Sequence, residues 1–261
     1  MSIMPELHPL NLHVHPDAKT ASQELAQEIA ACIRERANQG QRCVLGLATG
    51  SSPLPLYAEL VRLHQEDNLS FGNVVTFNLD EYCGLSPDSP LSYFDFMQKN
   101  LFSHIDIPAE QTHIPNGLLG KEEIAAHCQQ YEQHIEDEGG IDFQILGIGR
   151  TGHIGFNEPP SGLNSKTRLV VLDEITRQDA ASDFGGIENV PSQAITMGIA
   201  TIMKARRIVL MAWGSKKAEI IQNALTSRPS PNIAASFLKT HPQASFLLDT
   251  TAAALLTPAD S

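Results

Sequence analysis

Short apolar runs alternate with helical periodicities along the whole chain. The runs predict strands at Leu10–His15, Arg42–Leu47, Val74–Leu79, Phe143–Ile148, Arg168–Leu172, Ile208–Trp213 and Ser245–Leu248. The periodic stretches predict helices at Ala21–Asn38, Pro53–Gln65, Ser92–His104, Lys121–Glu138, Ser192–Lys204, Ser215–Thr226 and Asn232–Lys239. Several strands are apolar throughout, which is typical of parallel strands covered on both faces. The pattern therefore predicts an α/β fold.

Nothing in this alternation marks a domain boundary. No linker rich in Pro, Ser or Gly, no repeat and no charge block divides it, so residues 1–261 are predicted to form one domain. Phe156–Ser165 and Arg177–Gly186 carry turn formers and mixed charges without a clean period. Such irregular segments are often functional loops or lids, although a plain surface excursion has the same pattern.

Charge and cysteine content limit the binding partners and the cellular compartment that we expect for this protein. The 261 residues include 18 Lys plus Arg and 30 Asp plus Glu, a formal net charge of -12. We expect no binding to nucleic acid or to a membrane, because bulk charge opposes both and no apolar stretch could span a bilayer. Without a CxxC pair or a secretory signal, the four cysteines predict a cytoplasmic protein with reduced thiols.

A strand-to-helix turn at Thr49, Gly50, Ser51 and Ser52 is the first candidate binding element. Ser52 is predicted to cap the following helix and Pro53 to occupy its first position. Free N–H groups, hydroxyls and the positive helix end would then converge on an anion such as phosphate. An ordinary strand-to-helix turn has the same appearance.

Lys216 and Lys217 open a predicted helix after the strand Ile208–Trp213. Cations are unfavourable at a helix N-terminus unless an anion binds there. The two lysines therefore fit either a second part of an anion site or a solvated surface.

The strand Val74–Leu79 is followed by acidic residues at the end where α/β proteins bind ligands. The two-residue period of a strand places Asn78 and Asp80 on one side, facing a pocket, while Glu81 turns aside. The alternative is that Asp80 only caps the next turn.

The third candidate is a glycine-rich loop after the strand Phe143–Ile148. Gly147, Gly149 and Gly152 form a GxGxxG pattern, with Asp173 near the spacing of a dinucleotide fingerprint. That fingerprint requires a helix at the third glycine, and the glycines and prolines that follow (Gly155, Pro159, Pro160 and Gly162) prevent one. A nicotinamide cofactor is therefore not expected.

What remains of this loop is His153 close to Glu158. An imidazole beside a carboxylate is a proton-transfer pair, although a lone loop histidine is more often structural. Zinc is not expected, because no third ligand stands at metal spacing.

Taken in order, ATGSSP, FNLDEY, SYFDFM, GHIGFNEP, SKTR, PSQAITMGIATI, WGSKKA and HPQASFLLD resemble the glucosamine-6-phosphate deaminase/isomerase family over roughly residues 40 to 250. FNLDEY and GHIGFNEP distinguish that family from the 6-phosphogluconolactonases, which share its fold. The resemblance implies a single-domain, modified Rossmann-like fold with a mostly parallel open sheet, helices on both faces and an active-site lid. It also implies conversion of glucosamine 6-phosphate and water to fructose 6-phosphate and ammonia without a cofactor or a metal, and it is compatible with a homo-oligomer.

The same resemblance implies roles for individual residues. Asp80 matches the base that moves a proton between C2 and C1, His153 matches the ring-opening base, and Glu158 matches its acidic companion. The loop of Thr49, Gly50, Ser51 and Ser52 matches the phosphate loop, and Lys217 matches a phosphate-contacting lysine.

Two positions depart from the family pattern. Thr151 stands where the family commonly has Asp or Asn, and Ser182 stands where the lid usually carries a phosphate-binding arginine. Arg150 and Arg177 are the candidate substitutes for that arginine. Another sugar-phosphate isomerase or lactonase on this scaffold, or a non-catalytic sugar-phosphate sensor, therefore stays open as an alternative.

Overall fold

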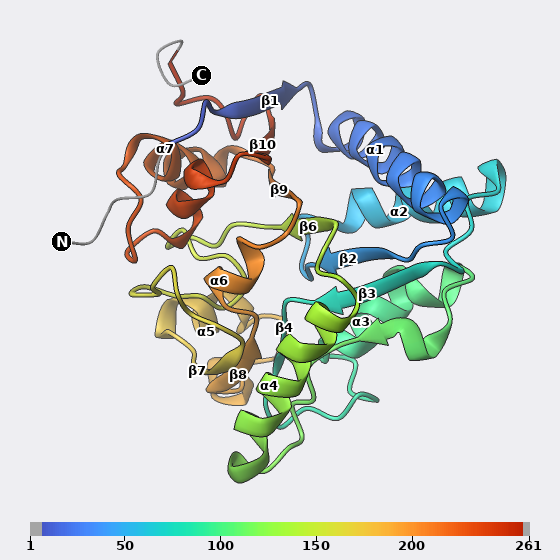
Figure 1. The fold of residues 1–261 in the computed structure, drawn as a ribbon. Coiled ribbons are helices and arrows are strands. Elements are labelled where there is room, and N and C mark those ends of the chain that lie inside the picture. Colours follow the sequence, from blue (N-terminus) through green and yellow to red (C-terminus); the bar gives the residue numbers. More distant parts are fainter. Residues whose placement is uncertain (1–6, 258–261) are drawn as a thin grey trace.

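A seven-stranded parallel sheet forms the centre of the computed structural model, which describes residues 7–257 (Figure 1). In spatial order its strands are β1 (Asn11–His15), β10 (Ala244–Asp249), β9 (Arg207–Ala212), β6 (Phe143–Leu146), β2 (Cys43–Leu47), β3 (Val74–Asn78) and β5 (Thr112–His113). Every pairing between neighbours is parallel. The predicted α/β class and mostly parallel open sheet are confirmed.

Helices cover both faces of this sheet, because strands apolar on both sides must bury both. One core contains side chains of α1 (Ala18–Asn38), α2 (Leu54–Asp67) and α3 (Tyr93–Asn100). The opposite core contains side chains of α4 (Lys121–Asp137), α6 (Ile199–Ile202) and α7 (Ala218–Thr226). Among residues 7–257, no helix is long and apolar enough to cross a membrane.

Several connections contain 3-10 helices. They are η1 (Phe102–His104), η2 (Ala109–Gln111), η3 (Ile187–Asn189), η4 (Ser215–Lys217) and η5 (Ala234–Thr240). The helix predicted at Asn232–Lys239 is therefore a 3-10 segment. The helix predicted at Ser215–Thr226 begins with a 3-10 turn and becomes α-helical at Ala218.

A small antiparallel sheet lies beside the main one. It consists of β4 (Asp80–Tyr82), β8 (Gln193–Thr196) and β7 (Arg168–Val171), with β8 in the middle. The helix predicted over Ser192–Lys204 is therefore wrong in its first half. Pairing on both edges of β8 overrides the local helical pattern, and Gly198 separates the strand from the short α6.

The segment Arg177–Gly186, predicted to be irregular, begins within α5 (Glu174–Ala180), which lies beside the small sheet in Figure 1. The seven residues of α5 are too few for a periodic signal. Asp173 caps this helix, because its carboxylate accepts a hydrogen bond from the N–H of Ile175 at 2.8 Å. Residues 173–190, here called the lid segment, thus begin as a capped helix, and Asp173 has a structural role rather than a ribose-binding one.

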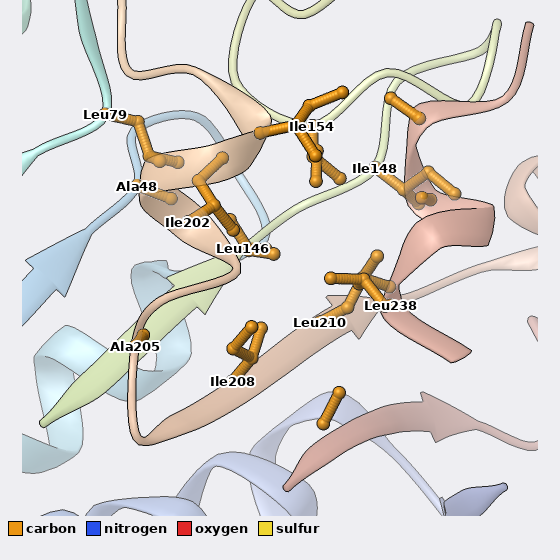
Figure 2. Close-up of a cluster of buried hydrophobic side chains, with 14 of the residues drawn as sticks. Ala48, Leu79, Leu146, Ile148, Ile154, Ile202, Ala205, Ile208, Leu210 and Leu238 are labelled. Atoms are coloured by element: carbon orange, nitrogen blue, oxygen red, sulfur yellow. The ribbon is translucent and has the colours of Figure 1, made fainter. Parts of the chain in front are cut away.

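The main core reaches the loops that follow the strands. Figure 2 shows Ala48, Leu79, Ile148 and Ile154 in one cluster with core residues of β9 and α6, and all four are at most 4% exposed. Each of them is adjacent in sequence to a predicted site residue or its loop. Packing of these apolar neighbours therefore fixes where the polar loop residues lie.

Candidate active site

Two adjoining cavities open at the carboxyl ends of four neighbouring strands, β9, β6, β2 and β3. The inner cavity, of about 220 Å³, is lined by the 49–52 loop, Asp80, Tyr93, the 147–149 loop, His153, Gly155, Phe156 and Lys217. The outer cavity, of about 540 Å³, shares part of this lining and adds Arg150 and the lid segment. Most of the predicted site residues, which come from distant parts of the sequence, therefore meet in one place.

The turn between β2 and α2 forms one wall of the inner cavity. Gly50 has a φ of +92°, which a residue with a side chain rarely adopts. Within residues 7–257, the N–H groups of Gly50, Ser51 and Ser52 have no protein hydrogen-bond partner. They are available to an anion, in front of the positive end of α2.

Capping of α2 differs by one residue from the prediction. Pro53, rather than Ser52, is the N-cap, and no side chain caps the helix. The Ser52 hydroxyl is therefore free for a ligand, while the indole Nε1 of Trp213 donates to the Ser52 carbonyl at 2.9 Å. This bond ties the turn to the residue that follows β9.

Lys217 lines both cavities from the turn before α7. Its Nζ donates to the carbonyl of Ile148 at 2.6 Å, which holds the ammonium beside the glycine-rich loop. Burial lowers the pKa of Lys217. Lys216 is exposed and lines neither cavity. The structure therefore shows which of the two lysines faces the candidate site, which the sequence did not.

Asp80 is 5% exposed and lines the inner cavity from β4. Burial, reinforced by the neighbouring Glu81 carboxylate, raises the pKa of Asp80 to about 8. A Cβ atom at Gly155 would lie only 3.2 Å from Oδ2 of Asp80, so a glycine permits this close approach. A buried carboxyl group with a pKa near neutrality is suited to take up and return a proton.

The neighbours of Asp80 have structural roles. The Glu81 carboxylate accepts hydrogen bonds from the N–H groups of Tyr93 and Phe94 at the start of α3, so it turns aside as predicted. Asn78 is fully buried on β3 and does not line the described cavities that contain Asp80. The prediction that Asn78 shares a pocket with Asp80 is wrong, because the chain leaves the main sheet between them.

His153 faces the inner cavity against the backbone of Gly149. A Cβ atom at Gly149 would lie 1.9 Å from Nε2 of His153, so only glycine leaves room for the ring. The Thr151 hydroxyl lies 2.9 Å from Nδ1. Burial and the charge of Lys217 lower the pKa of His153 to about 4, and the imidazole is therefore neutral at physiological pH.

Glu158 is not placed beside the His153 ring. One carboxylate oxygen accepts a hydrogen bond from the N–H of Asp173, and the side chain lines a different cavity together with Ser161 and Arg168. The prediction that Glu158 orients His153 is not met in this structure, where Thr151 occupies the orienting position. The cis Pro159–Pro160 peptide that follows Glu158 belongs to the turn that leads away from the inner cavity.

The two candidate arginines, Arg150 and Arg177, have different positions and contacts. Arg177 donates to the carbonyls of Ile187 and Val190 and thus braces the lid segment, so it is not a substitute for the family's lid arginine. Arg150 lines the outer cavity and forms an ion pair with Asp179 of α5 at 3.1 Å. It is therefore the second cation, beside Lys217, that an anion in the cavities would meet.

Tyr93 and Asp179 are site residues that were not singled out from the sequence. Tyr93 lines both cavities and stacks nearly parallel to Phe156, with ring centroids 6.0 Å apart. Its segment, SYFDFM, contributed only to the resemblance. Among the described residues, no cluster of three or more His, Cys, Asp or Glu side chains could hold a metal ion.

Comparison with known proteins identifies the protein family. Residues 16–246 match the family model described as glucosamine-6-phosphate isomerases/6-phosphogluconolactonase. The chain belongs to this family. A family member from Geobacillus sp. (strain WCH70), named glucosamine-6-phosphate deaminase, is 48% identical over 90% of this chain and 92% of its own length. A glucosamine-6-phosphate deaminase-like protein of Bacteroides thetaiotaomicron is 42% identical over 98% of this chain, which spans only 39% of that longer protein.

Solved structures agree with the family assignment. A solved structure described as a monomeric glucosamine-6-phosphate deaminase superposes with a TM-score of 0.90 at 43% identity, covering 95% of this chain and 100% of the other. Solved 6-phosphogluconolactonases at 22% identity or less share the fold alone. The predicted resemblance to the deaminase branch of this family is thus confirmed.

Proposed function

We propose that this enzyme converts glucosamine 6-phosphate and water to fructose 6-phosphate and ammonia. The observation that carries the proposal is the inner cavity, where a buried carboxyl group, a neutral imidazole and a cradle of N–H groups suited to an anion face the same space. Relatives named glucosamine-6-phosphate deaminase at 44 to 48% identity support the substrate. We also propose a cytoplasmic location, which suits the four free thiols.

Substrate binding would begin with the phosphate. The free N–H groups and hydroxyls of the 49–52 loop would donate hydrogen bonds to the phosphate oxygens, with Lys217 neutralising charge. Arg150 would add a contact to the phosphate if it leaves Asp179. The ion pair between Arg150 and Asp179 is exposed and therefore weak. Anchoring the phosphate restricts the sugar so that its reacting carbons lie near Asp80 and His153.

Ring opening would be the task of His153. For Nε2 to accept the proton of the anomeric hydroxyl, the other nitrogen must carry hydrogen and donate to the Thr151 oxygen. The resulting imidazolium returns the proton to the ring oxygen as the C1–O5 bond breaks. The low pKa of His153 favours this return.

Isomerisation would be the task of Asp80. Its carboxylate takes the C2 proton of the open-chain aldehyde, and the carboxylic acid returns a proton to C1. A second proton passes from the amine to O1, so the aldehyde becomes a CH2OH group and the amine at C2 becomes an imine. Water adds to the imine carbon and ammonia leaves, giving the C2 ketone of fructose 6-phosphate. One carboxyl group serves both transfers because it returns to its starting state.

An ammonia-release assay tests the proposal and separates its alternatives. We expect release from glucosamine 6-phosphate, and much weaker release from free glucosamine, which lacks the anchoring phosphate. The panel should also contain galactosamine 6-phosphate, both N-acetyl sugar phosphates and 6-phosphogluconolactone. Hydrolysis of the lactone alone would indicate a lactonase, and binding without turnover of any compound would indicate a sensor.

Replacement of Lys217 is predicted to weaken binding more than catalysis. We expect Lys217→Ala to raise KM for glucosamine 6-phosphate about tenfold or more and to change kcat little, because the phosphate is held alike in ground and transition states. Steady-state kinetics at low ionic strength measures this, and exposed Lys216→Ala is the matched control. Equal KM values in the two variants would assign Lys217 to the surface instead.

The raised pKa of Asp80 predicts an alkaline rate profile. Below a pKa of about 8 the group is mainly protonated and cannot act as a base, and its active carboxylate form accumulates as the pH rises. We therefore expect kcat/KM, which reports the free enzyme, to increase through about pH 8 and then level off. Initial rates and melting temperatures from about pH 6 to 9.5 check this; a maximum below about pH 7 would contradict it.

A further inference from the structure

Two free thiols outside the candidate active site are in direct contact. Cys32 lies on α1 and Cys43 is the first residue of β2, and their Sγ atoms are 3.8 Å apart. Both are reduced in this structure. Neither sulfur lines the inner or outer cavity, so the proposed reaction gives this contact no purpose.

The two thiols differ in ways that suit sequential chemistry. Cys32 is partly exposed, whereas Cys43 is 0% exposed. The contact with Cys43 lowers the pKa of Cys32 and Arg36 also favours the thiolate, whereas burial, Asp142 and Glu35 oppose it. Cys32 is thus the accessible, more acidic sulfur, and Cys43 is a sheltered neighbour within reach. Low-pKa, accessible thiols beside a second cysteine are typical of reversible thiol oxidation.

Contacts to Asp142 fix the position of α1 relative to β2 next to the two cysteines. The Arg36 guanidinium, one helical turn after Cys32, forms an ion pair with the Asp142 carboxylate. The other oxygen of Asp142 accepts a hydrogen bond at 2.9 Å from the N–H of Val44, the residue after Cys43. Only a modest approach of the two sulfurs is then needed to reach the bond length of about 2.05 Å in a disulfide.

We propose that Cys32 and Cys43 are a modification site at which a peroxide forms an intramolecular disulfide. The Cys32 thiolate attacks the O–O bond of hydrogen peroxide, which breaks to give a sulfenic acid and hydroxide. The buried Cys43 thiol then gives up its proton as its sulfur attacks the sulfenic sulfur, the S–S bond forms, and the second oxygen leaves as hydroxide. Hydroxide takes up the protons of the thiols, so two thiols are oxidised by two electrons and one peroxide becomes two waters.

Peptide mapping of the full-length protein tests this proposal. Reduced protein is treated with a small excess of hydrogen peroxide, blocked with iodoacetamide and digested with trypsin, which cleaves after Lys19, Arg34, Arg42 and Arg62. We expect peptides 20–34 and 43–62 linked, with a mass about 2 Da below their sum, and two of the four thiols lost. Dithiothreitol should restore both.

Variants make the outcome decisive. Cys83→Ser combined with Cys128→Ser should form the same link, whereas Cys32→Ser should leave Cys43 reduced. Cys43→Ser should stop the reaction at a dimedone-reactive sulfenic acid on Cys32, which tests the order of attack. Oxidation of Cys83 before Cys32, a disulfide between chains, or direct conversion of Cys32 to the sulfinic acid in the wild type would each overturn the proposal.

Discussion

Asp80→Asn is expected to lower kcat for ammonia release by about a hundredfold or more while leaving KM nearly unchanged. The amide has almost the same shape as the carboxyl group but cannot accept the C2 proton. Because Asp80 is buried without a cationic partner among the described residues, the substitution removes no ion pair, and the melting temperature should not fall. Steady-state kinetics and thermal unfolding at the same pH measure both effects.

A nearby acid provides the control for this substitution. Asp88 is exposed and lines neither cavity, so Asp88→Asn makes the same side-chain change away from the site and should keep wild-type turnover. If Asp80→Asn kept more than about a tenth of wild-type kcat, Asp80 would not be the base. A large loss in both variants would point to long-range charge rather than proton transfer.

Periodicity predicted the main sheet because its strands are short, apolar and separated by amphipathic helices. Two elements beside the main sheet, β8 and α5, do not carry that signal. Gln193–Thr196 reads locally as part of a helix and becomes β8 only because β4 and β7 pair with its two edges. α5 is shorter than two turns and depends on its Asp173 cap. Non-local pairing and side-chain capping decided these elements.

The residues of the candidate site also fall into those that the sequence predicted and those that it could not predict. Asp80, His153 and the 49–52 loop follow strands of one parallel sheet, and the carboxyl ends of such strands necessarily meet at one edge. The residue that contacts Nδ1 of His153 could not be predicted from its distance along the sequence. Glu158 is five residues from His153 but turns toward Asp173, whereas Thr151 reaches the ring across a tight turn. The direction of a glycine-rich loop depends on contacts that a linear pattern does not contain.

Thr151 in place of a carboxylate changes the expected acid–base balance of His153. A charged orienter would stabilise the imidazolium, whereas a hydroxyl supplies a neutral hydrogen bond. Burial and Lys217 lower the pKa of His153, and the carboxylates of Asp179 and Asp173 oppose them only in part. In the proposed mechanism, ring opening relies on a weakly basic imidazole that releases its proton readily.

The close packing of His153 against Gly149 gives the second large predicted effect. In Gly149→Ala the new methyl carbon would overlap Nε2, Cε1 and Cδ2 of the ring, all within 2.4 Å, so the imidazole must move. Because a displacement of about 1 Å can cost a hundredfold in rate, we expect kcat to fall by about 10- to 100-fold. Gly147→Ala is the matched control, because its methyl group would meet only Ser52, at an ordinary 3.7 Å. Gly149 does not have a positive φ, so backbone strain does not contribute to the difference. Kinetics with circular dichroism on both variants measures it, and equal activity would mean that the position of His153 does not limit turnover.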